Sequence, residues 1–132
     1  FTPRIDQGER LYHFWFNAGP ARARLDAIDR EALVRNEAPF ALSFFPHGEG
    51  AQPMPGLLLD DGVVQVTAFK RAEDGVGYIV RLYEPTGQPR STTLRVPSLS
   101  LSVSVELGSF EIKTLRLDPD TGTLVETGLL ES

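Results

Sequence analysis

The chain has 132 residues, of which 41% are hydrophobic and 23% charged, and its formal net charge is -5. These proportions are typical of a globular chain with a core and argue against intrinsic disorder. The acidic balance and the scattered Lys and Arg residues argue against nucleic-acid binding, because phosphate contacts need clustered basic groups. The sequence has no cysteine, which excludes disulfides and thiolate metal sites and favours a cytoplasmic location. No apolar run approaches the ~20 residues that span a bilayer.

The first part of the sequence indicates a strand, a helix and a second strand. Glu9–Asn17 has apolar side chains at both parities, which predicts a strand that is covered on both faces. Pro20 and Pro39 bracket a pattern with helical spacing, so we expect a helix between them. Its predicted apolar face consists of Leu25, Ile28, Ala32 and Leu33. Phe40–Phe45 is then expected to form a second, aromatic strand.

The segment Pro46–Pro55 resembles a linker, since it contains three prolines and two glycines. We therefore predict a domain boundary there, with residues 1–55 in one unit and residues 56–132 in another.

The second unit begins with the pattern of a β-hairpin. Two apolar runs, Val63–Phe69 and Tyr78–Tyr83, flank a polar connection that contains Gly75 and Gly77. Glycine takes backbone angles that other residues avoid, as a tight connection requires. Asp60–Gly62 is expected to be the turn before this hairpin.

Further short strands follow at the spacing of a β-sandwich. Leu99–Leu107 alternates aliphatic residues with serines and Glu106, which predicts one buried and one wet face. Thr92–Val96 and Thr123–Leu130 are predicted strands, and Asp118–Gly122 is a predicted turn. The sequence therefore predicts about six or seven strands in an all-β, antiparallel sandwich.

One predicted strand changes phase along its length. Phe110 and Ile112 would face the core at its start, whereas Leu115 and Leu117 would face the core at its end. Strict alternation cannot bury both pairs on one face, so we expect a β-bulge near residues 113 and 114.

The word order of several segments resembles the C-terminal region of the glycoside hydrolase family 38 α-mannosidases. The most specific match is Lys70–Gly75 followed by Arg81–Glu84 and Gly87. Similar segments are Asp6–Arg10 with Tyr12–Phe14, Arg30–Pro39, Leu107–Leu117 and Glu126–Glu131.

This resemblance implies an immunoglobulin-like β-sandwich that follows a strand-helix-strand remnant of a β-supersandwich (galactose mutarotase-like) domain. It further implies the non-catalytic C-terminal part of a zinc-dependent retaining α-mannosidase that hydrolyses α-mannosides in oligosaccharides. The zinc and the reactive groups would lie in an earlier domain of that enzyme. Because the sequence begins with Phe1 rather than Met and lacks those motifs, we expect a tail fragment that supports the enzyme's central β-domain. Its expected partners are the rest of that chain and, through it, the oligosaccharide; no nucleic acid or membrane partner is expected.

Several groups could carry chemistry, but a structural interpretation is favoured for each. Asp118 and Asp120 begin like a calcium loop, yet Gly122 stands where a third oxygen ligand is needed. His13 and His47 lack the spacing of paired metal ligands. The adjacent carboxylates at 60–61 and 73–74 are expected in turns, where they seldom converge on one sugar. The sequence predicts no catalytic, cofactor-binding or metal-ligating residue in this chain.

A group of aromatic residues near the N-terminal end has two interpretations. It could be a sugar-stacking platform, which would make the chain an independent carbohydrate-binding module, or it could be an interface. We favour an interface, because both faces of the first predicted strand are apolar. A fragment with such a surface is expected to self-associate. A third possibility is an immunoglobulin-like protein-interaction domain unrelated to glycosidases. The residues are Tyr12, Phe14, Trp15, Phe16, Phe40, Phe44 and Phe45.

Overall fold

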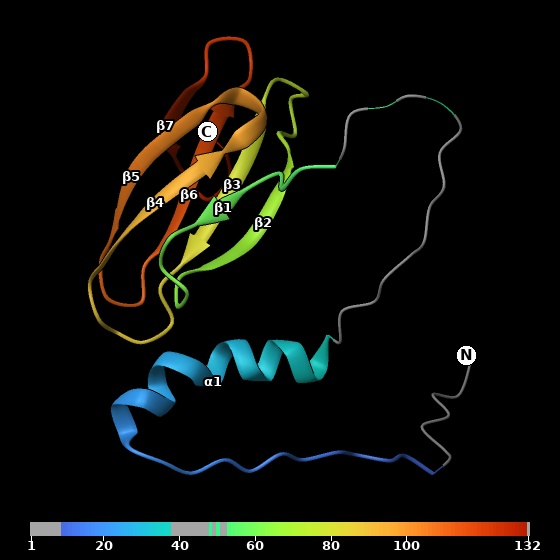
Figure 1. Cartoon of the computed structure of the whole chain (residues 1–132), viewed down its shortest axis with the longest axis vertical. Helices are drawn as coiled ribbons and strands as arrows, with labels where there is room; N and C mark the ends of the chain where they lie inside the picture. Colours follow the sequence, from blue (N-terminus) through green and yellow to red (C-terminus); the bar gives the residue numbers. More distant parts are fainter. Residues whose placement is uncertain (1–8, 38–47, 49, 51–52, 132) are drawn as a thin grey trace, which may run out of the picture.

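The computed structural model describes residues 9–37, 48, 50 and 53–131, and these form one α-helix and a two-sheet β-sandwich (Figure 1). The helix α1 spans Ala21–Asn36. One sheet has the order β1-β4-β5, with β1 at Leu58–Leu59, β4 at Arg90–Val96 and β5 at Leu101–Leu107. The other has the order β2-β3-β6-β7, with β2 at Gln65–Arg71, β3 at Tyr78–Tyr83, β6 at Ile112–Asp118 and β7 at Thr123–Thr127. All strand pairs are antiparallel, so the predicted all-β sandwich is confirmed.

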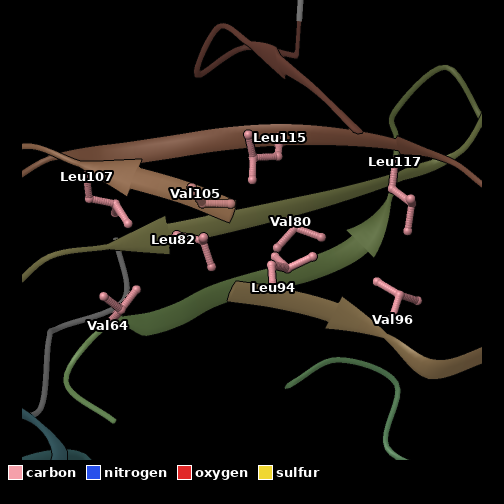
Figure 2. Close-up of a cluster of buried hydrophobic side chains, with 9 residues drawn as sticks. All are labelled: Val64, Val80, Leu82, Leu94, Val96, Val105, Leu107, Leu115 and Leu117. Carbon is pink, nitrogen blue, oxygen red and sulfur yellow. The ribbon is translucent and has the colours of Figure 1, made fainter. Parts of the chain in front are cut away.

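The core lies between the two sheets and is entirely aliphatic (Figure 2). Strands β3, β4, β5 and β6 each contribute two residues at alternate positions, as the period of two requires. In β5, Val105 and Leu107 are buried while Ser104 and Glu106 are exposed, which confirms the predicted wet face. The buried cluster consists of Val64, Val80, Leu82, Leu94, Val96, Val105, Leu107, Leu115 and Leu117.

The predicted hairpin is formed by β2 and β3. Gly75 and Gly77 have φ values of 79° and 77°, in the left-handed region that favours glycine. A Cβ atom at Gly77 would lie 2.4 Å from the carbonyl oxygen of Leu117, so the connection also needs glycine for space.

The prediction of a β-bulge near residues 113 and 114, in β6, is wrong. β6 pairs with β3 residue by residue from Ile112 to Leu117, without a register shift. The conflict of phase disappears because Phe110 and Ile112 do not face the core; their exposed fractions are 64% and 55%. A register shift occurs instead in β2, between Val66 and Ala68.

The strand expected at Glu9–Asn17 is also absent from the described residues. This segment has neither helical nor strand structure, and each of its residues is exposed. A strand is held by hydrogen bonds to a neighbouring strand, and none of the strands within the described ranges pairs with this segment. The expected strand Phe40–Phe45 and most of Pro46–Pro55 lie outside those ranges. The expected helix is confirmed as α1, which begins after Pro20 and is too short and too polar to cross a membrane.

The last strand ends earlier than predicted, at Thr127, and the chain then forms a strap, Gly128–Glu131, across the outer face of the four-stranded sheet. The Arg81 guanidinium donates to the carbonyl oxygen of Leu129 at 2.9 Å. The Glu131 carboxylate accepts from the backbone N–H of Glu73 at 2.9 Å and pairs with the Lys70 ammonium at 2.7 Å. Ile79, which points away from the core because its neighbours Val80 and Leu82 point into it, is nevertheless 0% exposed. The strap therefore covers part of the sheet.

We predict that removal of residues 128–132 destabilises the sandwich by roughly 1–2 kcal/mol, because the Arg81 guanidinium loses the Leu129 carbonyl and Lys70 loses the Glu131 carboxylate. Urea unfolding followed by circular dichroism measures the loss. The control is Leu130→Ala, since Leu130 is 85% exposed, and it should change stability by less than about 0.5 kcal/mol. Equal stability of the shortened and intact chains would contradict the covering role of the strap.

Candidate functional site

A cluster of charged side chains around Glu84 and Arg90 lies at one end of the sandwich. The loops that follow β1, β3 and β5 meet there, at the end that faces α1 (Figure 1). Its acidic members are Glu84, Asp61 and Asp26, and the Arg90 guanidinium pairs with all three of them.

The centre of this cluster is the carboxylate of Glu84, whose side chain is 0% exposed. It accepts hydrogen bonds from the backbone N–H groups of Thr86 at 2.8 Å, Gly87 at 2.7 Å and Gln88 at 3.2 Å. It also accepts from the Thr86 hydroxyl and, at 3.1 Å, from the backbone N–H of Phe110. The carboxylate therefore joins the β3–β4 loop to the β5–β6 loop.

The local sequence explains why the chain turns around this carboxylate. Pro85 has no N–H group and a fixed φ angle, so it favours the end of β3, whose last residue is Tyr83. Gly87 has a φ of 72°, and a Cβ atom there would lie 2.6 Å from the Phe110 ring. Phe110 itself has a φ of 56°, a conformation that costs about 1–2 kcal/mol for a residue with a Cβ. Its hydrogen bond to the Glu84 carboxylate offsets that cost.

The hydrogen bonds determine the protonation state of Glu84. Burial alone would raise its pKa, but the donors from Thr86, Phe110 and Gly87 outweigh burial and lower the pKa to about 2. Glu84 is thus ionised at neutral pH and has no proton to donate. Its role is to hold loops together rather than to act as a general acid.

Arg90 connects this carboxylate to a third loop. Its Nε donates to Glu84 at 3.3 Å and its Nη1 donates to Asp61 at 3.3 Å. The other oxygen of Asp61 accepts from the backbone N–H groups of Val63 at 2.6 Å and Val64 at 3.3 Å. Burial alone would raise the pKa of Asp61, but these two N–H groups and Arg90 lower it below its usual value. Three loops and both sheets therefore share one buried network.

We predict that Glu84→Gln destabilises the sandwich by about 2–4 kcal/mol, because the amide cannot accept all the donors and Arg90 loses a buried counter-charge. The measurement is urea unfolding at pH 7. Glu106→Gln is the matched control, since Glu106 is exposed on β5 and bonds only the Ser91 hydroxyl among the described side chains. If the two substitutions lowered the free energy of unfolding equally, the contacts of Glu84 would contribute no more than those of an exposed glutamate, which would contradict the prediction.

The carboxylate pairs considered in the sequence do not converge on one place. Asp60 pairs with Arg95 and Asp61 with Arg90, on the two sides of one bend. In the hairpin, Asp74 accepts from the Val76 backbone N–H at 2.9 Å. Its neighbour Glu73 lies 3.5 Å from the Lys70 ammonium, while Asp74 pairs with Arg116. Each carboxylate thus serves a turn or an ion pair.

The candidate metal ligands have structural roles as well. One oxygen of Asp118 accepts from the backbone N–H of Asp120 at 2.9 Å, which shapes the turn before β7. The His13 ring lies 5.9 Å from that of Trp15, and His47 lies outside the described residues. In the part of the chain that the structure describes, no three His, Asp or Glu side chains gather in a group that could hold a metal ion.

The aromatic surface of the sequence analysis lies partly within the described residues. Tyr12, Phe14, Trp15 and Phe16 are all exposed, and the Arg35 guanidinium lies 5.6 Å from the centre of the Trp15 ring. A groove of about 750 Å³ lies between this segment and α1, and its walls include Trp15 and Phe16 of the segment and Ile28 of the helix. Phe40, Phe44 and Phe45 lie outside the described residues.

Sequence reasoning missed the network around Glu84. Its only local signal is an acidic residue that follows an apolar strand and precedes Pro-Thr-Gly, a turn whose N–H groups can bind a carboxylate. The partners Arg90, Asp61 and Phe110 come from other loops and leave no such signal.

Comparison with known families gives one match, and it covers the centre of the sandwich. Residues 63–104 match the model of the glycosyl hydrolases family 38 C-terminal beta sandwich domain. No curated protein and no solved structure matches the chain. The matched residues include β2, β3 and β4 together with Glu84, Gly87 and Arg90. The predicted resemblance is therefore confirmed: residues 63–104 have the sequence pattern of the C-terminal β-sandwich domain of glycosyl hydrolase family 38.

Proposed function

We propose that this chain is a non-catalytic C-terminal part of a zinc-dependent retaining α-mannosidase and that it supports the central β-domain of that enzyme. The match of residues 63–104 to the family's C-terminal sandwich is the observation that carries the proposal. The partner is the rest of the mannosidase chain, which acts on α-mannosides in oligosaccharides, and a cytoplasmic location suits the cysteine-free sequence.

The charged groups of the sandwich support a scaffold role. Glu84 and Asp61 are ionised and engaged by N–H groups and by Arg90, so they stiffen the end of the sandwich. The described residues offer no set of three ligands that fits zinc, and we derive no zinc-dependent step from this chain. Zinc belongs, in this proposal, to the catalytic domain of the parent enzyme.

The N-terminal aromatic segment supports an interface with that enzyme. Large apolar surfaces in water favour association, and Phe14 and Phe16 are among the most exposed aromatic residues described. A domain that covered this segment would bury both faces of residues 9–17, as their apolar pattern requires.

We predict that the purified chain, incubated with zinc and an aryl α-mannoside, releases no aryl alcohol above the rate of the buffer. The release is followed by absorbance. Turnover that saturates with substrate and disappears with a chelator would contradict the proposal.

A second candidate function is carbohydrate binding, which the groove beside Trp15 favours, because an aromatic face there lies close to the polar side chains of Arg24 and Glu31. Trp15 is the single tryptophan, so its fluorescence reports on this groove alone. In a titration with mannosides, the scaffold proposal predicts no saturable change. A saturable change that Glu31→Gln abolishes would favour the binding module.

A further inference from the structure

The ion pair between α1 and the sandwich joins residues that are far apart in the sequence. One Oδ of Asp26 lies 2.6 Å from Nη2 of Arg90, and the two residues are 64 positions apart. Asp26 lies in the middle of α1, and Arg90 begins β4 with its side chain at the end of the sandwich.

The rest of the sandwich holds Arg90 in place for this contact. Glu84 accepts from its Nε and Asp61 accepts from its Nη1, and both acceptors belong to the sandwich. Its Nη2 also donates to the Thr86 hydroxyl at 3.2 Å and has capacity for one more acceptor. The side chain of Arg90 is only 13% exposed. The guanidinium is thus a preorganised receptor for one carboxylate.

Apolar packing does not hold the helix to the sandwich. No residue of α1 is buried. Between the second half of α1 and the β1–β2 edge runs a groove of about 470 Å³, where Leu33 and Val34 face Leu57, Leu59 and Val66 across open space. Contacts across such a gap contribute little, because dispersion attraction falls steeply with distance.

An ion pair between a carboxylate and a partly buried guanidinium is stronger than an ion pair on the exposed surface. The side chain of Asp26 is 34% exposed, and the charge-assisted bond is short. Arg22, at 3.4 Å, is the other base near Asp26 and belongs to the same helix, so it does not link the two parts.

We propose that Arg90 is a docking site for a carboxylate, that Asp26 of α1 is its occupant, and that this ion pair fixes α1 on the end of the sandwich. The proposal goes beyond the proposed function, since it concerns only how two parts of this chain are joined. Asp26 is a positioning residue, and Glu84 and Asp61 orient the guanidinium that receives it.

The test measures the distance between α1 and the sandwich in the whole chain. The sequence has no cysteine, so spin labels can be placed at Ala32→Cys on α1 and Ser104→Cys on the exposed face of β5. With Asp26 intact we expect one narrow distance distribution. Asp26→Asn should broaden it at least twofold, and Asp26→Glu should restore most of its width.

Asp29→Asn is the matched control. It removes the same charge from the same helix, and Asp29 has no ion pair with the sandwich in the described residues. Helix content is checked in each variant by circular dichroism. A distribution that broadens with Asp26→Asn alone supports the docking site. A distribution that stays unchanged in both variants, or that broadens equally in both, overturns it.

Discussion

The ionised, buried carboxylate of Glu84 is the constraint on which the end of the sandwich depends. A charge removed from water is tolerated only where paired charges and hydrogen bonds replace hydration. Glu84 obtains them from its own turn, from Phe110 of another loop and from Arg90 of β4. The need to surround this carboxylate with donors explains three local features. They are the left-handed backbone of Phe110, the glycine at position 87 and the inward direction of the Arg90 side chain. The aliphatic core holds the sheets face to face, whereas this network sets how their connections meet.

The network also relates the sequence to the proposed function. The most specific part of the family resemblance is Lys70–Gly75 followed by Arg81–Glu84 and Gly87, and two of these residues, Glu84 and Gly87, build the turn around the carboxylate. They fall within residues 63–104, which match the family's C-terminal sandwich. A sequence pattern that encodes a hydrogen-bonded loop junction is consistent with the supporting role proposed above, because Glu84 and Arg90 are engaged in structural contacts. The same junction presents Arg90 to Asp26, so it links α1 to the sandwich as well.

Local patterns were sufficient to predict the elements that local physics controls. The hairpin follows from its glycine positions, and β5 follows from the alternation predicted for Leu99–Leu107, although the strand begins only at Leu101. Helix α1 lies between the prolines that bracket it in the sequence, but no residue of its predicted apolar face is buried. Predictions that needed distant partners failed. Glu9–Asn17 has an apolar pattern but no strand beside it in the described residues, and Ile112 is exposed because its phase follows its pairing with Tyr83. The burial of Glu84 depends on donors up to 26 residues away, which periodicity does not reveal. The boundary between residues 55 and 56 stays a prediction, as do the partners and the location.

The most direct test of this account is the titration of the Glu84 carboxyl by nuclear magnetic resonance in the folded chain. We predict a pKa of about 2 for this carboxyl group, against an ordinary value of 4.5. Because the folded pKa lies below the unfolded one, the stabilisation is complete above the unfolded value and is lost as the pH falls from about 4.5 towards 2. Titration of Glu84 near 4.5 in the folded chain would contradict the account, since it would mean that the hydrogen bonds around the carboxylate do not favour its charge.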